Sequence, residues 1–178
     1  MKSHFLGEDF FDRSVIHVAQ EMLGATLRCR QKDGNVLRMI VNETEAYDGE
    51  EDLACHASKG KTPRNEVMYG PAGVIYLYLC YGMHWLLNVV CCEEGYPAAV
   101  LIRGTLEVTG PGRLTKKLGI TGELNRKQAT PKSGLWFEKR EYEIANVESG
   151  SRIGVKYAGK YWASKPYRFW FSKHNSGA

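Results

Sequence analysis

Two glutamates stand at alternate positions near the end of 36–47, a run rich in strand-forming residues. Side chains on a strand alternate between its faces, so every second residue from Met39 to Tyr47 is expected on one face, which starts apolar and ends with Glu43, Glu45 and an aromatic ring. Carboxylates are seldom buried without a partner or a task, so this face could form the rim of a site that uses a carboxylate as acid or base. The alternative is that both glutamates simply reach solvent where the strand ends.

A second candidate is Tyr81, in a short turn between the apolar runs 74–80 and 84–90, which together predict a hairpin. Alternation places Tyr76 and Tyr78 on one face of the first run and its aliphatic residues on the other. An aromatic side chain at an exposed turn is well placed to wedge between base pairs. Alternatively, Tyr81 is a surface tyrosine folded back on its own hairpin.

A third candidate is the start of a short predicted helix at Gly110-Pro111-Gly112-Arg113, which offers free backbone N–H groups beside Lys116 and Lys117. A helix N-terminus can hold a phosphate, although glycine and proline also stand there for conformational reasons. Net charge is uneven: residues 1–109 carry 10 basic and 15 acidic residues, whereas residues 110–178 carry 14 and 5. The basic half could meet a polyanion such as DNA, or could be an ordinary solvated surface.

Cysteine chemistry is disfavoured. The five cysteines are odd in number and lack C-x-x-C spacing, so we expect neither a disulfide framework nor a metal site. Adjacent side chains in an extended segment diverge, so Cys55 and His56 cannot readily form a nucleophile and base, although His56 remains a candidate ligand-binding residue.

The elements that must position these residues follow from the apolar pattern. Helical spacing at 15–23 predicts a helix that begins after Asp12 or Ser14 and stops at Gly24. Strands are expected at 25–31, 36–47, 74–80, 84–90 and 98–103, with a long ordered loop over 48–73. At 178 residues the chain is expected to form one domain, and with neither a membrane-spanning run nor a secretory signal it is expected to be intracellular.

Several separated motifs follow one another along the chain: 43–47 (ETEAY), 52–56 (DLACH), 62–65 (TPRN), 76–83 (YLYLCYGM), Asn88, 101–103 (LIR), 110–114 (GPGRL) and 164–170 (SKPYRFW). In their order and spacing they resemble the alkyladenine (3-methyladenine) DNA glycosylase family. The likeness extends from about Phe10 to Phe171. The resemblance implies an α+β fold: a single mixed domain around a curved antiparallel sheet, with a protruding hairpin and peripheral helices.

The resemblance also implies roles for individual residues. Glu45 matches the general base, which breaks the tie with Glu43, and Arg103 matches an arginine that orients Glu45 and the water. Tyr81 would fill the gap left by a flipped nucleotide. The base pocket would be lined by Tyr47, His56, Tyr78 and Asn88, the last disfavouring the exocyclic amine of guanine. Contacts to the DNA backbone are expected from Arg64, Gly112, Arg113 and Lys116.

The implied activity is hydrolysis of the N-glycosidic bond of alkylated or deaminated purines in duplex DNA, without a cofactor, a metal or strand cleavage, by a monomer. Two alternatives remain. A non-catalytic binder of distorted DNA on the same fold would not need Glu45 and Arg103. A small-molecule hydrolase would not need the basic half and would bind with little salt dependence.

Overall fold

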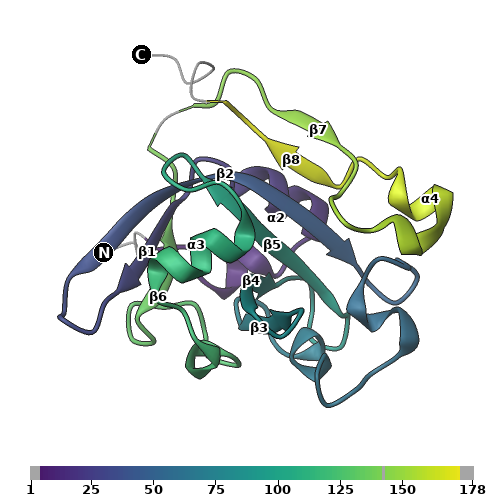
Figure 1. The fold of residues 1–178 in the computed structure, drawn as a ribbon, viewed down its shortest axis with the longest axis horizontal. Helices are drawn as coiled ribbons and strands as arrows, with labels where there is room; N and C mark the ends of the chain where they lie inside the picture. The colour runs from purple at the N-terminus through teal and green to yellow at the C-terminus, as the bar shows by residue number, and fades with distance from the viewer. Residues whose placement is uncertain (1–4, 142, 173–178) are drawn as a thin grey trace.

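The computed structural model describes residues 5–141 and 143–172, and its centre is a curved antiparallel sheet (Figure 1). Six strands follow one another in the order β3-β4-β5-β2-β1-β6; β8 also pairs with β2, and β7 pairs with β8. The strands are β1 Thr26–Arg30, β2 Val36–Asp48, β3 Ile75–Cys80, β4 His84–Val90, β5 Ala98–Thr105, β6 Leu135–Glu138, β7 Glu148–Gly150 and β8 Arg168–Trp170. The α+β fold with a curved antiparallel sheet is confirmed.

The helices are short and lie around the sheet. α2 (Val15–Glu21) packs against β2 and β5, and α3 (Pro111–Leu118) packs against β4 and β5. Two 3-10 helices, η1 (His56–Lys59) and η2 (Glu66–Tyr69), break the loop that follows β2. The remaining helices are α1 Glu8–Phe11, η3 Gly122–Leu124, η4 Lys156–Ala158 and α4 Gly159–Ala163. No helix in the described ranges is long and apolar enough to cross a membrane.

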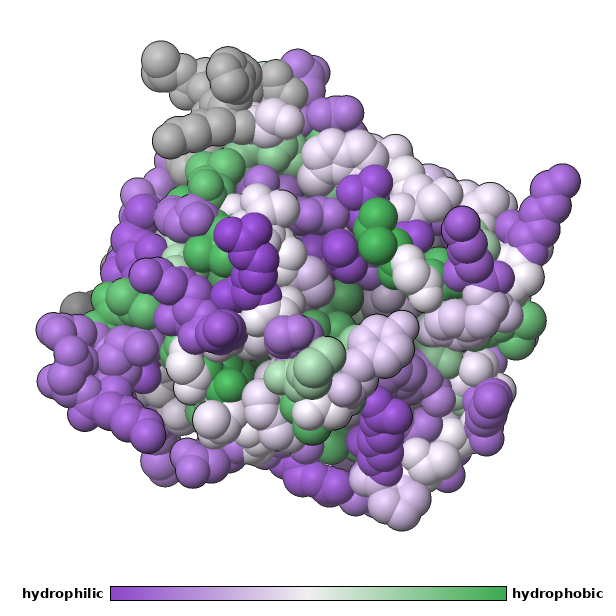
Figure 2. All heavy atoms as spheres, in the orientation of Figure 1, coloured by the Kyte–Doolittle hydropathy of each residue, from purple (hydrophilic) through white to green (hydrophobic). Residues whose placement is uncertain are grey.

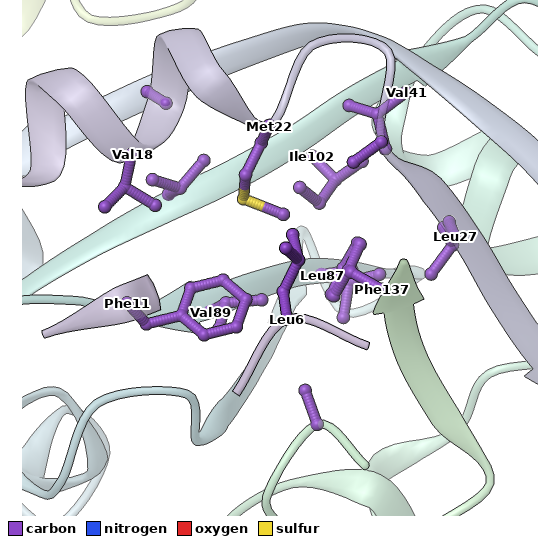
Figure 3. Packing of buried hydrophobic residues seen from close by; sticks show 14 of the residues in the cluster. Leu6, Phe11, Val18, Met22, Leu27, Val41, Leu87, Val89, Ile102 and Phe137 are labelled. Atoms are coloured by element: carbon purple, nitrogen blue, oxygen red, sulfur yellow. The ribbon is translucent and has the colours of Figure 1, made fainter. Parts of the chain in front are cut away.

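The core fills the space between the sheet and α2 (Figure 3). Val18 of α2 and Met22, which directly follows the helix, project toward Ile102 of β5, and all three are fully buried. The chain leaves this helix through Gly24, whose φ of +81° suits glycine and whose N–H donates to the Val41 carbonyl at 2.8 Å. The helix expected from the spacing at 15–23 is therefore present, and its apolar stripe anchors β2.

The strict alternation expected along β2 is wrong. The pairing of β2 with β5 shifts register between Val41 and Glu43 and again between Glu43 and Thr44. Val41 consequently packs in the core (Figure 3), whereas Glu43 forms ion pairs with arginines. Beyond the shift, Thr44 points toward α2 and donates to the Ala19 carbonyl at 2.7 Å. The irregularity thus allows the first half of β2 to pack its side chains in the core, while Glu43 and Glu45 in the second half face arginines.

Candidate active site

Glu45 is completely buried, yet both of its carboxylate oxygens accept a hydrogen bond. The Tyr47 hydroxyl donates to Oε2 at 2.7 Å, and the Ile153 backbone N–H donates to Oε1 at 2.7 Å. Arg103 of β5 lies near the same carboxylate, with Nη1 at 3.6 Å from Oε1. The structure therefore brings together Glu45, Tyr47 and Arg103, three of the residues predicted from sequence.

Burial raises the pKa of Glu45, and it outweighs the opposing effects of Arg103, the Ile153 N–H and the Tyr47 hydroxyl. A carboxylate with a raised pKa is a stronger base once ionised. An ionised carboxylate has about four lone-pair sites, so each oxygen keeps one after these two hydrogen bonds. Glu45 can therefore accept a proton from a further group, such as a water molecule.

Glu43 does not reach solvent, so the alternative in which both glutamates simply become exposed at the strand end is wrong. Its side chain is 16% exposed, and Oε1 accepts one bond from Arg103 Nε and another from Arg168 Nη1, each at 3.1 Å. The two glutamates thus share Arg103 but have different surroundings, because only Glu45 is fully enclosed.

A small cavity is lined mainly by aromatic side chains, among them Tyr47, whose hydroxyl donates to Glu45. It contains all four residues predicted for a base pocket, together with three that were not. The lining residues are Tyr47, His56, Met68, Tyr76, Tyr78, Asn88 and Ala99. Asn88 is buried, and its Nδ2 donates to the carbonyls of Tyr76 and Leu86, which leaves the side-chain oxygen as the group available to the cavity.

His56 is held by neighbours on three sides. Its Nδ1 lies 2.9 Å from the Tyr76 hydroxyl, and its ring meets Tyr78 edge to face with the centroids 4.5 Å apart. Asn65 donates from Nδ2 to the His56 carbonyl at 3.0 Å. Burial, and then the charge of Arg64, lowers the pKa of His56 to about 4. Part of the His56 side chain is exposed, and solvent there weakens the effect of burial on its pKa. Because the pKa is lowered, the imidazole is neutral at pH 7.

Behind the cavity wall, Arg152 and Asp52 form an ion pair whose side chains are both fully buried. The Arg152 guanidinium also donates to the Ala46 carbonyl at 2.8 Å and lies over the Tyr47 ring, 4.9 Å from its centroid. Because Arg152 directly precedes Ile153, this pair fixes both the cavity wall and the N–H that binds Glu45.

A groove leads from the cavity to the hairpin tip and the start of α3. Tyr81 lines it, is 91% exposed and has a φ of +50°, which non-glycine residues adopt mainly in tight turns. The exposed tip contradicts the alternative in which this side chain folds back on its hairpin. Figure 2 shows that the face of the molecule in view is mostly hydrophilic, with hydrophobic residues in small separate groups.

The four residues predicted to contact the DNA backbone lie at different places. Arg64 and Gly112 line the groove, whereas Arg113 and Lys116 are exposed on α3. Gly112 also has a packing reason to be glycine, because an added Cβ would lie 3.0 Å from the His84 side chain. Their contact with DNA stays a prediction.

Sequence reasoning missed several residues of the site. Arg152, Ile153 and Tyr157, the last of which lines the groove, lie more than 100 positions after Glu45 along the chain, so no local pattern could connect them with it. Tyr76 was placed on the correct face of its strand but not in the pocket. Arg168 was noted only as part of a motif, although it contacts Glu43.

The fold and the site together define a small α+β enzyme with a buried carboxylate beside an aromatic cavity. A family model described as methylpurine-DNA glycosylase matches residues 9–109 and 105–175. A relative from Myxococcus xanthus, assigned as a 3-methyladenine DNA glycosylase, is 49% identical, and the match covers 94% of this chain and 90% of the relative. Relatives with the same assignment from Sodalis glossinidius and Methanocella arvoryzae are 43% and 41% identical, covering 93% of this chain and 98% and 91% of theirs.

The chain belongs to the methylpurine-DNA glycosylase family. It is therefore a DNA repair enzyme that hydrolyses N-glycosyl bonds, and the predicted family is confirmed. Membership also sets aside the alternative of a small-molecule hydrolase.

Proposed function

We propose that this glycosylase flips an alkylated purine out of duplex DNA into the aromatic cavity, where water activated by Glu45 hydrolyses the N-glycosidic bond and leaves an abasic site. The observation that carries the proposal is the setting of Glu45: a fully buried carboxylate, its pKa raised by burial, next to a cavity lined by three tyrosines. We also propose that the enzyme acts as a monomer.

The chemical step requires one base and a means of stabilising positive charge. As the C1′–N bond to the purine breaks, its electron pair moves to the base, and the sugar develops positive charge. Before it takes up a proton, the ionised carboxylate of Glu45 stabilises the positive charge that develops on the sugar. Water then adds to C1′ and gives a proton to Glu45. Arg103, whose Nη1 lies 3.6 Å from Oε1, is close enough to help orient Glu45 and the water.

The cavity favours alkylated purines through its aromatic faces. Tyr47 and Tyr78 offer ring faces to a cationic base such as 3-methyladenine, and cation–π attraction contributes about 0.5–2 kcal/mol per contact. Neutral His56 can hydrogen-bond at the purine 6-position. Asn88 stands at the cavity wall, where it disfavours the exocyclic amine of normal guanine.

Tyr81 and the basic half of the chain bind the DNA duplex in this proposal. Tyr81 is exposed at the hairpin tip and lines the groove, so its ring can enter the space vacated by the flipped nucleotide. Phosphate contacts from Arg64, the start of α3 and Lys116 would make binding weaken as salt is raised.

The test is release of 3-methyladenine from methylated duplex DNA by the wild-type enzyme and by Glu45→Gln. We expect the variant to lose about 10²–10⁴-fold in single-turnover rate, the range for a general base, while its affinity for lesion-containing duplex in fluorescence anisotropy stays within a few-fold. Glu138→Gln is the matched control, because Glu138 pairs with Arg28 on the same sheet but outside the site. Release by Glu45→Gln at the wild-type rate would refute the assignment, and no release by the wild-type protein would favour the non-catalytic binder.

A further inference from the structure

We infer that Glu43 is a positioning residue, which holds the Arg103 side chain in the orientation that presents its guanidinium to Glu45. The inference rests on the proposed function of Glu45 as the base. It assigns separate tasks to two carboxylates that stand two residues apart on one strand.

The Arg103 guanidinium is anchored at its Nε atom by Glu43. Arg103 Nε donates to Glu43 Oε1 at 3.1 Å, whereas Nη1 lies 3.6 Å from Glu45 Oε1, beyond ordinary hydrogen-bond length. A guanidinium is planar and rigid, so an anchored Nε determines the direction in which Nη1 points. Among the described residues, the bond to Glu43 is the one hydrogen bond recorded for the Arg103 side chain. Glu43 is therefore its main restraint.

Glu43 is itself held in place by a second arginine. Arg168 Nη1 donates to the same Oε1 atom at 3.1 Å. Arg168 is fixed independently, because its Nε donates to the Ser151 carbonyl at 2.9 Å and its guanidinium lies 4.1 Å from the centroid of the Trp170 ring. Glu43 thus lies between one arginine that is anchored by its own neighbours and one that faces the catalytic carboxylate.

The low exposure of this cluster strengthens the restraint. The side chains of Arg103 and Glu43 are 15% and 16% exposed, so solvent screens their attraction less than it screens a surface ion pair. The charged groups that face Glu45 are Arg103 from β5 and Arg152 from the segment after β7. Loosening Arg103 would leave Glu45 with weaker stabilisation of its ionised form.

The test uses Glu43→Ala, Glu43→Gln and the matched control Glu138→Ala, which removes the carboxylate partner of another arginine Nε on the same sheet, at 2.8 Å. We expect Glu43→Ala to lower the single-turnover rate about tenfold to a hundredfold, because small misplacements of a catalytic group have effects of that size. Glu43→Gln keeps an acceptor oxygen for Arg103 and should restore most of the rate. Glu138→Ala should behave like wild type, and affinity for lesion duplex should change less than threefold in all three.

The pH profile separates positioning from a loss of structure. Arg103 lowers the pKa of Glu45, so Glu43→Ala should move the acidic limb of the rate profile to higher pH, whereas Glu43→Gln should leave it near that of wild type. Glu43→Ala should also add no further loss in an Arg103→Ala background, since its effect passes through Arg103.

Three results would overturn the inference: a wild-type rate and profile for Glu43→Ala, equal losses in Glu43→Ala and Glu43→Gln, or additive losses with Arg103→Ala. The failure of this inference is distinct from the failure of the proposed function. An active Glu45→Gln enzyme would refute the function, whereas an inactive Glu45→Gln with an unaffected Glu43→Ala would refute only the role of Glu43.

Discussion

The buried ion pair between Asp52 and Arg152 provides the sharpest test of how the site is held together. We predict that Asp52→Asn destabilises the fold by about 3–5 kcal/mol, the usual cost of leaving one buried charge without its partner. Both side chains are fully buried, and an arginine cannot lose its proton to escape the penalty. For a domain of this size, the loss corresponds to a melting temperature lower by roughly 6–20 °C.

Removing the arginine of the pair instead should lower the stability of the fold by less. In Arg152→Met the Asp52 carboxylate keeps two backbone donors, the N–H groups of Asp48 and Ala54, at 3.1 and 3.0 Å. In Asp52→Asn the guanidinium keeps the Ala46 and Trp162 carbonyls and loses the group that balanced its charge. The double variant Asp52→Asn/Arg152→Met should be more stable than Asp52→Asn alone, because the uncompensated charge is gone.

Urea unfolding followed by circular dichroism would measure all three variants, with Glu21→Gln as control, since Glu21 pairs with Arg13 at an exposed site where such pairs contribute less than about 1 kcal/mol. A loss below about 1 kcal/mol for Asp52→Asn, or a double variant less stable than Asp52→Asn, would refute the reasoning.

Three further predictions concern single side chains of the site. Burial raises the pKa of Glu45 above its value in the unfolded chain, so the folded state loses stability as the pH rises from the unfolded pKa through the folded pKa. Glu45→Gln should therefore be as stable as wild type in acid and more stable at pH 8. Urea midpoints of the two proteins that do not diverge as the pH rises would contradict this. His56, with its pKa lowered to about 4, should stay neutral in an NMR titration down to pH 5, and protonation near pH 6.5 would contradict a pKa lowered by burial. Tyr81→Ala should weaken binding to lesion duplex by about 1–3 kcal/mol without changing the melting temperature, because the side chain is 91% exposed; unchanged affinity in anisotropy would argue against the wedge.

Local patterns in the sequence predicted β1 to β5, α2 and the start of α3, but they did not predict β6, β7 or β8. The spacing of Val15, Val18 and Met22 predicted α2, and alternating tyrosines and aliphatic residues predicted both faces of β3. Such patterns work because each element must bury one face. The register shift at Glu43 could not be predicted, because it arises from the pairing of β2 with a strand about 60 residues later.

The candidate site divides in the same way. Glu45 and Tyr47 could be placed on one face from their spacing, and the family resemblance distinguished Glu45 from Glu43. The partners that determine how Glu45 behaves could not be predicted, since Ile153 contributes only its backbone N–H and leaves no trace in residue type. Arg152 gave no signal either, because a lone arginine in a basic segment looks like a surface residue until its burial is known.

The hydrogen bond between Glu45 and the Ile153 N–H has a consequence for the order of synthesis. As the chain emerges from the ribosome, β1 to β5 can pair once residue 105 is available, but the final donor to Glu45 and the Arg168 partner of Glu43 come much later. A nascent chain that has formed only the central strands would therefore still lack the Ile153 donor to Glu45 and the Arg168 donor to Glu43. The contacts around the two glutamates are therefore complete only after Ile153 and Arg168 have been added and β8 pairs with β2.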